Sequence, residues 1–526
     1  MNLSKFMRRT ACEVRIGRTT IGGGHPVACQ SMTNTDTNDT AASVAQIERI
    51  DRAGGKIVRL TAQGRREGEN LENIVRQLRA DGFRTAVVAD IHFVPEVAAI
   101  AARYVDKVRV NPGNYRLDRG DLQSLIAQCR ERGVALRVGV NHGSLAKRVF
   151  DEWGDTPQGM VVSAMEFLRV CRECDFDQVV VSMKSSNTRV MVAAYRLLVE
   201  AMDAEDMHYP IHLGVTEAGN GIEGRVKSAV GIGALMADGI GDTIRVSLTE
   251  APEREIPVAR MLADYFAGRE NHAPIPAVDE SLYSPYSYRK RPSEKIGGIG
   301  GDAQVAIWSE IPAAVRETLF EADIRTVDRI PRGRIVLLKT NNLNGIAEQR
   351  AALLTMAGRG LTNPVIIQRT YDESDPEVLQ IKAAADLGPL FLDGFGDAIR
   401  IENLNPAIPQ SEIDALSLDI LQTARVRISK PEYIACPSCG RTLYNIEKTL
   451  AAIKARTGHL VGVKIGVMGC IVNGPGEMAD ADYGYVGSGP GRITLYKGRE
   501  VVRRNIPEEQ AIDALLELIE KSQMER

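Results

Sequence analysis

The chain has 526 residues, of which 44% are hydrophobic and 25% are charged, and its formal net charge is -3 at pH 7. This composition is typical of a globular protein, and the length predicts roughly two to four domains. A charge so close to neutral does not indicate nucleic acid binding, and no apolar run approaches the roughly 18 residues that a membrane span needs. The eight cysteines are too sparse for a disulfide scaffold, and the first residues contain no apolar signal segment. We therefore expect a cytoplasmic protein with free thiols.

Short β-branched runs alternate with longer amphipathic segments between residues 25 and about 268. Eight such runs occur, at residues 26–33, 56–61, 85–93, 107–114, 135–144, 178–186, 211–219 and 243–250. Strand and helix alternating eight times in about 250 residues is typical of a (β/α)8 TIM barrel, whose active site lies at the C-terminal ends of the strands. We predict this α/β barrel for residues 1–268, with a doubly wound open sheet as the alternative.

The rest of the chain changes character twice. Residues 269–300 are rich in Pro, Gly, Ser and Tyr and indicate a linker. Further strand-like runs follow at 333–340, 363–371 and 387–401, so we predict an inserted α/β domain over 269–428 with a structural role. Residues 429–526 predict a small α+β domain with three cysteines in its loops.

Cations stand near the ends of most predicted barrel strands, although strand interiors rarely carry charge. They are Arg59, His92, Arg109, Arg137, Lys184 and Arg245. Pointing inward at the mouth of the barrel, they would bind a polyanion, most simply a diphosphate held by forked guanidinium donors. The alternative for each is an ion pair with a neighbouring acid inside the barrel.

Acids and amides share this rim. Asp90, Glu217 and Glu250 could balance the cations, and one or two of them could serve in acid and base chemistry. Asn141 and Asn111 could orient substrate hydroxyls or simply cap turns. Residues 219–224, "GNGIEG", match a dinucleotide fingerprint but follow the seventh strand, where a barrel commonly holds phosphate, so we favour a phosphate contact over NAD.

Three cysteines in the last domain have the spacing of a metal site. Cys436 and Cys439 are separated by two residues and precede a predicted helix, whose N-terminal amides would favour thiolates. Cys470 enters a Gly-Pro-Gly turn that presents Glu477. An iron–sulfur cluster held by three thiolates leaves one iron for an exchangeable oxygen ligand, and a zinc site is the alternative. A second pair, Cys171 and Cys174, lies in a helical pattern and indicates packing.

Several motifs together resemble one family. "ACPSCGRT", "GVMGCIVNGPGE" and "GYVG" at the C-terminal end, with "QSMTNTDTNDT", "VRLTAQG", "ADIHF", "VRVNPGN" and "RVGVNHGSL" in the barrel, resemble the 4-hydroxy-3-methylbut-2-enyl diphosphate synthases of the non-mevalonate isoprenoid pathway. The cluster domain also resembles a module of sulfite and nitrite reductases. The resemblance implies reductive ring opening and dehydration of 2-C-methyl-D-erythritol 2,4-cyclodiphosphate, with two electrons delivered singly through a [4Fe-4S] cluster.

The same resemblance implies roles for individual residues. Cluster ligands would be Cys436, Cys439, Cys470 and Glu477, and the barrel cations Arg59, His92, Arg109, Arg137 and Lys184 would hold the diphosphate. Asn141 and Glu217 would stand near the reacting carbons, with Glu217 as a candidate acid, and a ferredoxin or flavodoxin would donate the electrons.

The central region departs from the short bacterial pattern and is similar to a longer, three-domain form. Short members pair the cluster domain of one subunit with the barrel of its partner in a homodimer, whereas a long insert could let both domains of one chain meet. Two other hypotheses remain at this level: a pterin-dependent methyltransferase-type barrel, and a zinc or iron–sulfur binding protein without catalysis.

Overall fold

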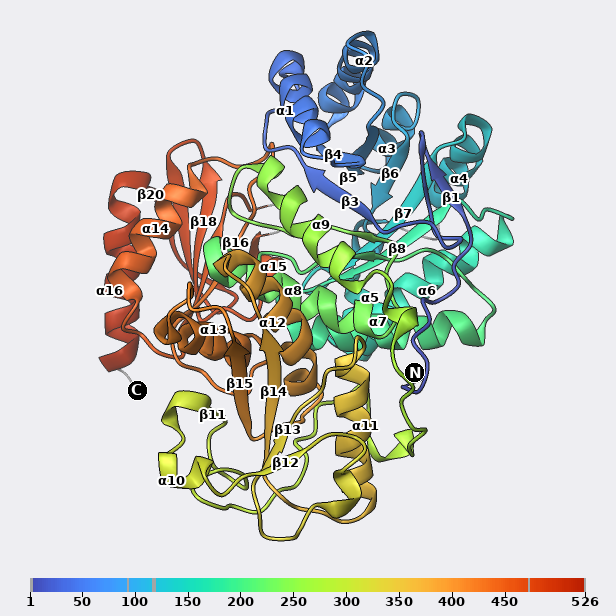
Figure 1. Cartoon of the computed structure of the whole chain (residues 1–526). Helices are drawn as coiled ribbons and strands as arrows, with labels where there is room; N and C mark the ends of the chain where they lie inside the picture. The colour runs from blue at the N-terminus through green and yellow to red at the C-terminus, as the bar shows by residue number, and fades with distance from the viewer. Residues whose placement is uncertain (1–2, 92–93, 116–119, 472–473, 525–526) are drawn as a thin grey trace. The chain divides into compact units, whose positions relative to one another are not determined.

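The computed structural model describes residues 3–91, 94–115, 120–471 and 474–524 (Figure 1). The chain divides into two compact units. One contains residues 10–224, 241–260 and 430–526, and the other contains residues 1–9, 225–240 and 261–429. Within the described ranges, no helix is both long and apolar enough to cross a membrane.

Eight parallel strands form the predicted barrel, which is thereby confirmed. In chain order they are β3 (Ala28–Met32), β4 (Ile57–Ala62), β5 (Ala86–Ile91), β6 (Lys107–Val110), β7 (Ala135–Asn141), β8 (Val179–Lys184), β9 (His212–Leu213) and β10 (Thr243–Ile244). They are hydrogen-bonded in the order β8-β7-β6-β5-β4-β3-β10-β9. The ring is closed between β8 and β9 by the Val181 amide, which donates to the carbonyl of Pro210 at 3.0 Å.

Helices follow the strands, as the alternating pattern predicts. They are α1 (Thr40–Arg52), α2 (Arg65–Ala80), α3 (Pro95–Ala101), α4 (Asp121–Arg132), α5 (Lys147–Trp153), α6 (Pro157–Glu173), α7 (Thr188–Ala204), α8 (Gly221–Ala237) and α9 (Glu255–Phe266). Several begin at side-chain caps; Asp39, for example, accepts a hydrogen bond from the amide of Ala42 at the start of α1.

An antiparallel hairpin, which the sequence patterns do not predict, closes the barrel at the N-terminal ends of its strands. It consists of β1 (Val14–Ile16) and β2 (Thr19–Ile21). Val14, Ile16 and Ile21 are fully buried and pack with Ile57 and Val88 from the barrel interior. This end of the barrel is therefore closed by apolar side chains.

The C-terminal part of the same unit is a five-stranded sheet covered by helices, as its α+β pattern predicts. The strands are β16 (Glu432–Ala435), β17 (Lys464–Met468), β18 (Tyr483–Gly489), β19 (Arg492–Lys497) and β20 (Glu500–Pro507), paired in sequence order. The helices are α14 (Ile446–Thr457), α15 (Gly474–Glu477) and α16 (Glu508–Met524). We call residues 430–526 the cluster domain, because they carry the predicted cluster ligands.

The second unit contains a parallel sheet with strand order β11-β15-β14-β13-β12. Its strands are β11 (Ala306–Ile307), β12 (Phe320–Ala322), β13 (Val336–Leu338), β14 (Val365–Tyr371) and β15 (Ala398–Asn403), and its helices are α10 (Ala313–Arg316), α11 (Gly345–Gly358), α12 (Pro376–Leu392) and α13 (Gln410–Thr423). The strand expected over residues 387–401 is wrong in its first part, since residues 387–392 belong to α12. Most of α12 is buried, and a helix that is apolar on all sides has the same local pattern as a buried strand.

Candidate functional site

A small cavity of about 50 Å³ lies where the barrel strands end, between the barrel and the cluster domain of the same unit. Its lining consists of Met32, Arg59, Asp90, Arg109, Asn141, Lys184, Thr216, Glu217, Arg245, Cys436, Pro437, Ser438, Cys439, Arg441 and Glu477. Ten of these residues are among those that the sequence predicts for the site. The structure therefore brings the barrel cations and two of the cysteines to one place.

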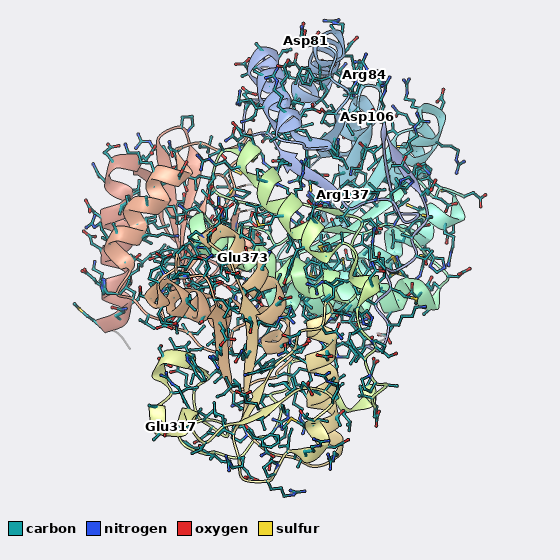
Figure 2. The ribbon with its side chains drawn as sticks, viewed as in Figure 1. Asp81, Arg84, Asp106, Arg137, Glu317 and Glu373 are labelled. Atoms are coloured by element: carbon teal, nitrogen blue, oxygen red, sulfur yellow. The ribbon has the colours of Figure 1, made fainter. Side chains whose placement is uncertain are left out.

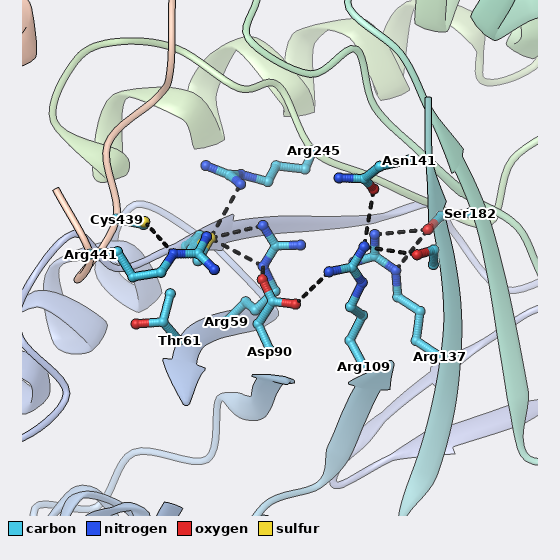
Figure 3. Close-up of polar contacts among 12 residues, drawn as sticks. Arg59, Thr61, Asp90, Arg109, Arg137, Asn141, Ser182, Arg245, Cys439 and Arg441 are labelled. Atoms are coloured by element: carbon cyan, nitrogen blue, oxygen red, sulfur yellow. Dashed lines mark hydrogen bonds and ion pairs between the residues drawn. The ribbon is translucent and has the colours of Figure 1, made fainter. Parts of the chain in front are cut away.

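A chain of hydrogen bonds links β5 to the cluster domain, and Figure 3 shows its barrel part from Asp90 through Arg109 to Asn141. Arg109 Nη1 donates to Asp90 Oδ1 at 3.0 Å, and Arg109 Nη2 donates to Asn141 Oδ1 at 3.0 Å. Asn141 Nδ2 in turn donates to Glu477 Oε1 at 2.8 Å. Asn141 thus uses both ends of its amide and orients the carboxylate of Glu477.

Arg59 and Arg245 meet at the sulfur of Met32. Arg59 Nε and Nη2 lie 3.1 and 2.8 Å from Met32 Sδ, and Arg59 Nε lies 3.5 Å from Asp90 Oδ2. Arg245 makes a two-pronged ion pair with buried Glu255, with both N–O distances at 3.0 Å. For Arg245 the alternative to substrate binding, an ion pair with a neighbouring acid, is therefore what the structure shows. Its guanidinium is held by an acid from the helix that follows β10.

Arg137 does not line the cavity, although we predicted it in the substrate site. It is fully buried among the barrel strands (Figure 2), in register with Arg109 of the neighbouring strand β6, and its Nε and Nη2 donate to Ser182 Oγ at 3.0 and 2.8 Å. Beside it on β6, Lys107 is also fully buried, and its Nζ has no hydrogen-bond partner within the described ranges. His92, another predicted cation, lies outside the described residues.

Lys184 and Glu217 face one another across the rim. Burial, together with the charges of Arg137 and Arg59, lowers the pKa of Lys184 well below its usual value. Burial, the charge of Glu477 and a hydrogen bond with that carboxyl group raise the pKa of Glu217 well above its usual value. Glu217 has a left-handed backbone, with φ at 48°, a strained conformation that is frequent at functional positions. Glu217 is therefore suited to hold a proton beside Glu477.

Three of the four predicted cluster ligands line the cavity. Cys436 and Cys439 line the cavity, whereas partly exposed Cys470 does not. Burial raises the pKa of Cys436 well above its usual value, and the negative charges of Cys439, Glu217, Glu477 and Cys470 raise it further. We expected helix N-terminal amides to favour a thiolate at Cys436. The helix α14 begins only at Ile446, so the protein alone does not favour this thiolate. A nearby metal cation would supply the missing stabilisation.

The ligand set fits a multi-iron cluster in its chemistry. Three thiols and one carboxylate are the donors that such a cluster with one oxygen-bound iron needs. Among the described His, Cys, Asp and Glu side chains, no three are grouped as ligands of a single metal ion.

Polar contacts hold the cluster domain over the barrel mouth. Lys430 and Lys454 bind Glu223 at 2.7 Å each, and Lys454 Nζ donates to Asn220 Oδ1 at 2.9 Å. The segment "GNGIEG", which we expected to contact phosphate, supplies these partners and does not line the cavity. Thr249 Oγ1 also donates to the carbonyl of Cys436 at 3.0 Å.

The remaining polar rim residues form turns. Asn111 Oδ1 accepts from the amide of Gly113 and its Nδ2 donates to Ser144 Oγ, which is the capping alternative. Glu250 accepts from the amide of Gly221 at 2.9 Å. Cys171 is buried in α6, as its packing role predicts.

The sequence patterns missed Met32, Thr216 and Arg441. Met32 gives no signal because methionine is common in cores. Arg441 had a signal: it stands two residues after Cys439 in "CPSCGRT", so the same loop that carries the thiols carries it to the cavity.

Comparison with known proteins finds family matches for the barrel and for the cluster domain. The family profile "GcpE TIM-barrel domain" matches residues 11–260, and "GcpE protein C-terminal domain" matches residues 432–521. The chain is 45% identical to the 4-hydroxy-3-methylbut-2-en-1-yl diphosphate synthase (flavodoxin) of Parabacteroides distasonis, over 98% of each chain. Identically named proteins of Porphyromonas gingivalis and Akkermansia muciniphila are 45% and 42% identical, over 99% and 98% of this chain and 99% and 97% of theirs.

Proposed function

Because this chain belongs to the GcpE family, we propose that it reduces 2-C-methyl-D-erythritol 2,4-cyclodiphosphate to 4-hydroxy-3-methylbut-2-enyl diphosphate in isoprenoid biosynthesis. In this reaction one ring C–O bond to the diphosphate breaks, a hydroxyl group leaves as water, and two electrons enter together with protons. The observation that carries the proposal is the cavity itself, where cations from the barrel strands face thiols of the cluster domain.

The barrel side of the cavity is built to bind an anion. Arg59, Arg109 and Lys184 line a buried space in which burial, together with the neighbouring cations, disfavours the charged form of Lys184. A diphosphate at this place would neutralise these charges and restore the lysine cation. We propose these three residues as the main diphosphate contacts. Arg137 would support them from within the barrel, Arg245 would orient the site through its pair with Glu255, and His92 would remain a candidate from sequence alone.

The cluster side supplies the electron chemistry. We propose that Cys436, Cys439, Cys470 and Glu477 hold a [4Fe-4S] cluster, which when bound delivers single electrons and offers one iron to an oxygen ligand. Asn141 would keep the Glu477 carboxylate in place through its 2.8 Å hydrogen bond. Glu217 would hold a proton for the leaving hydroxyl, while Asp90 would fix Arg109 for the substrate.

The size of the cavity indicates that substrate enters a wider state. Ligand pockets usually measure about 300–1,000 Å³, far more than the cavity of about 50 Å³ in this arrangement. The contacts of Glu223 and Thr249 with the cluster domain would therefore open and re-form in each cycle. Because residues of the barrel and of the cluster domain line the same cavity, we propose closure within one chain, and a homodimer stays a prediction.

The names of the relatives support a flavodoxin as the electron donor, with ferredoxin as the alternative. We place the enzyme in the reducing cytoplasm, where its cysteines stay as thiols. The division into a barrel (1–268), an inserted domain (269–428) and a cluster domain (429–526) is supported by the matched ranges 11–260 and 432–521.

Anaerobic turnover of the cyclic diphosphate with a chemical one-electron reductant tests the function. We expect a brown protein with broad absorbance near 400 nm, about four irons per chain, and formation of the linear diphosphate. A colourless zinc protein, or a brown protein that leaves the cyclic diphosphate intact, would contradict the proposal.

A further inference from the structure

Arg441 is a cation that the cluster domain, rather than the barrel, brings to the cavity. It lines the cavity together with Arg59, Asp90 and Arg109 of the barrel. Its Nε donates to Cys439 Sγ at 3.3 Å, and Figure 3 shows its guanidinium pointing toward Arg59 and Asp90. One side chain thus contacts a predicted cluster ligand and faces the predicted diphosphate site.

The backbone beside Arg441 lies directly on the barrel. A Cβ placed on Gly440 would stand 2.5 Å from the carbonyl oxygen of Thr35 and 2.9 Å from Thr61 Oγ1. The turn itself is tight, because Cys439 N donates to Thr442 Oγ1 at 3.0 Å and Thr442 N donates to the carbonyl of Cys439 at 2.9 Å. The guanidinium therefore reaches this position only when the loop is seated on the barrel.

Arg441 lies near both an acidic group and the barrel cations. Its Nε donates to the sulfur of Cys439, and Asp90, Arg59 and Arg109 line the cavity beside it. On the barrel side, burial lowers the pKa of Arg59 to about 10, and the positive charge of Arg441 contributes to this lowering. Closing the loop thus brings like charges together, and an anion between them would remove the repulsion.

Building on the proposed function, we infer that Arg441 is a positioning residue that the cluster domain contributes to the diphosphate site. Its forked guanidinium holds the Cys439 sulfur through Nε and presents its Nη groups to a diphosphate oxygen opposite Arg59 and Arg109. Binding of the diphosphate then draws the thiol-bearing loop onto the barrel. In this way the substrate itself assembles the site in which it reacts.

A purely structural role for Arg441 makes a different prediction. If the residue only neutralised Asp90 and helped the domains to close, its loss would resemble the loss of any other contact between them. Arg499 provides this comparison, because its Nη2 lies 3.1 Å from Asp155 Oδ2 of the barrel and it does not line the cavity.

The test compares Arg441→Gln, Arg441→Lys and Arg499→Gln in the cluster-loaded full chain. Calorimetric titration with inorganic pyrophosphate measures the anion site without turnover, and steady-state kinetics with a chemical reductant give KM for the cyclic diphosphate. We expect Arg441→Gln to weaken pyrophosphate binding and to raise KM by roughly ten- to a hundredfold. Arg441→Lys should recover part of this loss, since it keeps the charge without the fork, and Arg499→Gln should stay within about threefold of the original protein.

Iron content and the melting temperature verify that each variant is folded and loaded. Unchanged pyrophosphate affinity in Arg441→Gln would overturn the inference, as would equal losses in Arg441→Gln and Arg499→Gln. If the original protein binds pyrophosphate but does not convert the cyclic diphosphate, the proposed function fails, while the pyrophosphate comparison still decides the role of Arg441.

Discussion

Asn141 and Glu477 are joined by a hydrogen bond of 2.8 Å, although 336 residues separate them in the chain. Asn141 ends β7 of the barrel, and Glu477 ends the short helix α15 of the cluster domain. Because Asn141 also accepts a hydrogen bond from Arg109, the carboxylate that we assign to the cluster is coupled to the cations that we assign to the substrate.

Replacing Asn141 by aspartate should break the link between the Glu477 carboxylate and the barrel cations. The new carboxylate would face Glu477 and repel it, so we expect the kcat to fall roughly ten- to a hundredfold while the protein stays folded. Steady-state kinetics with a chemical reductant measure the effect. Asn111→Asp is the matched control, because it keeps the oxygen that caps its turn. Equal rates for both variants would show that the Asn141–Glu477 contact does not serve catalysis.

Removing the carboxylate of Glu477 should leave a cluster that assembles but is labile. Three thiolates still hold three irons in Glu477→Ala, whereas the fourth iron loses its protein ligand. We expect faster loss of iron and of absorbance near 400 nm in air, together with slow turnover. Asp480→Asn, which changes a carboxylate that accepts from Asn187 at 3.2 Å, should lose iron at the original rate. Full activity with a stable cluster in Glu477→Ala would remove this residue from the ligand set.

Gly440→Ala should interfere with seating of the cysteine loop. Its Cβ would overlap the carbonyl oxygen of Thr35 at 2.5 Å, so the loop must move away from the barrel. We expect kcat/KM to fall at least about tenfold, with a nearly unchanged melting temperature. Gly489→Ala is the control, because the atom nearest to its new Cβ is 3.8 Å away. Original kinetics in Gly440→Ala would mean that the loop does not need this close approach.

Glu223 makes the docking of the cluster domain sensitive to acid. Burial tends to raise its pKa, but the charges and hydrogen bonds of Lys430 and Lys454 outweigh burial and lower it. A lowered pKa stabilises the folded state above the unfolded pKa of about 4.3, and this contribution disappears as the pH falls through the folded pKa. We expect Glu223→Gln to lower the free energy of unfolding by about 1 kcal/mol at pH 7, and by progressively less as the pH falls below the unfolded pKa.

Denaturant unfolding of the original protein, Glu223→Gln and the exposed control Glu72→Gln at several pH values measures this difference. A deficit in Glu223→Gln that stays constant from pH 7 to pH 3 would contradict the assignment of the ion pair.

Lys107→Met should stabilise the barrel. Lys107 is fully buried, and burial with the charges of Arg137 and Arg59 lowers its pKa well below the usual value. The unfolded chain therefore binds more protons than the folded one below about pH 10.4, and the stability of the original protein rises with pH in this range. Methionine removes the cost of burying an unpaired amine, so we expect a gain of roughly 1–3 kcal/mol at pH 7.

Melting curves at pH 7 and pH 9 test this expectation, with the exposed Lys147→Met as control. The gain in stability should shrink at pH 9. At that pH the lysine of the original protein is closer to its neutral form, which costs less to bury. A lower melting temperature in Lys107→Met at both pH values would show that the ammonium group has a stabilising partner in the folded protein.

Local patterns were sufficient to predict the barrel, the α+β cluster domain and ten of the residues that line the cavity. Strand periodicity gives the order of the barrel elements, and parallel strands necessarily bring their C-terminal ends to one rim, so Arg59, Arg109 and Lys184 could be predicted to meet. The hairpin of β1 and β2 escaped prediction because strands of three residues are too short to show a period.

The sequence by itself determined which chemical groups this protein can bring together, because thiol spacing and strand-end charges are local properties. Only the tertiary structure decided how these groups are used. In the folded protein Arg245 pairs with Glu255 and Arg137 donates to Ser182. Arg441 reaches the cavity on the loop of Cys439. The physical reason is that a side chain's partner depends on its direction and on distances between segments that are remote in sequence, neither of which a local pattern contains.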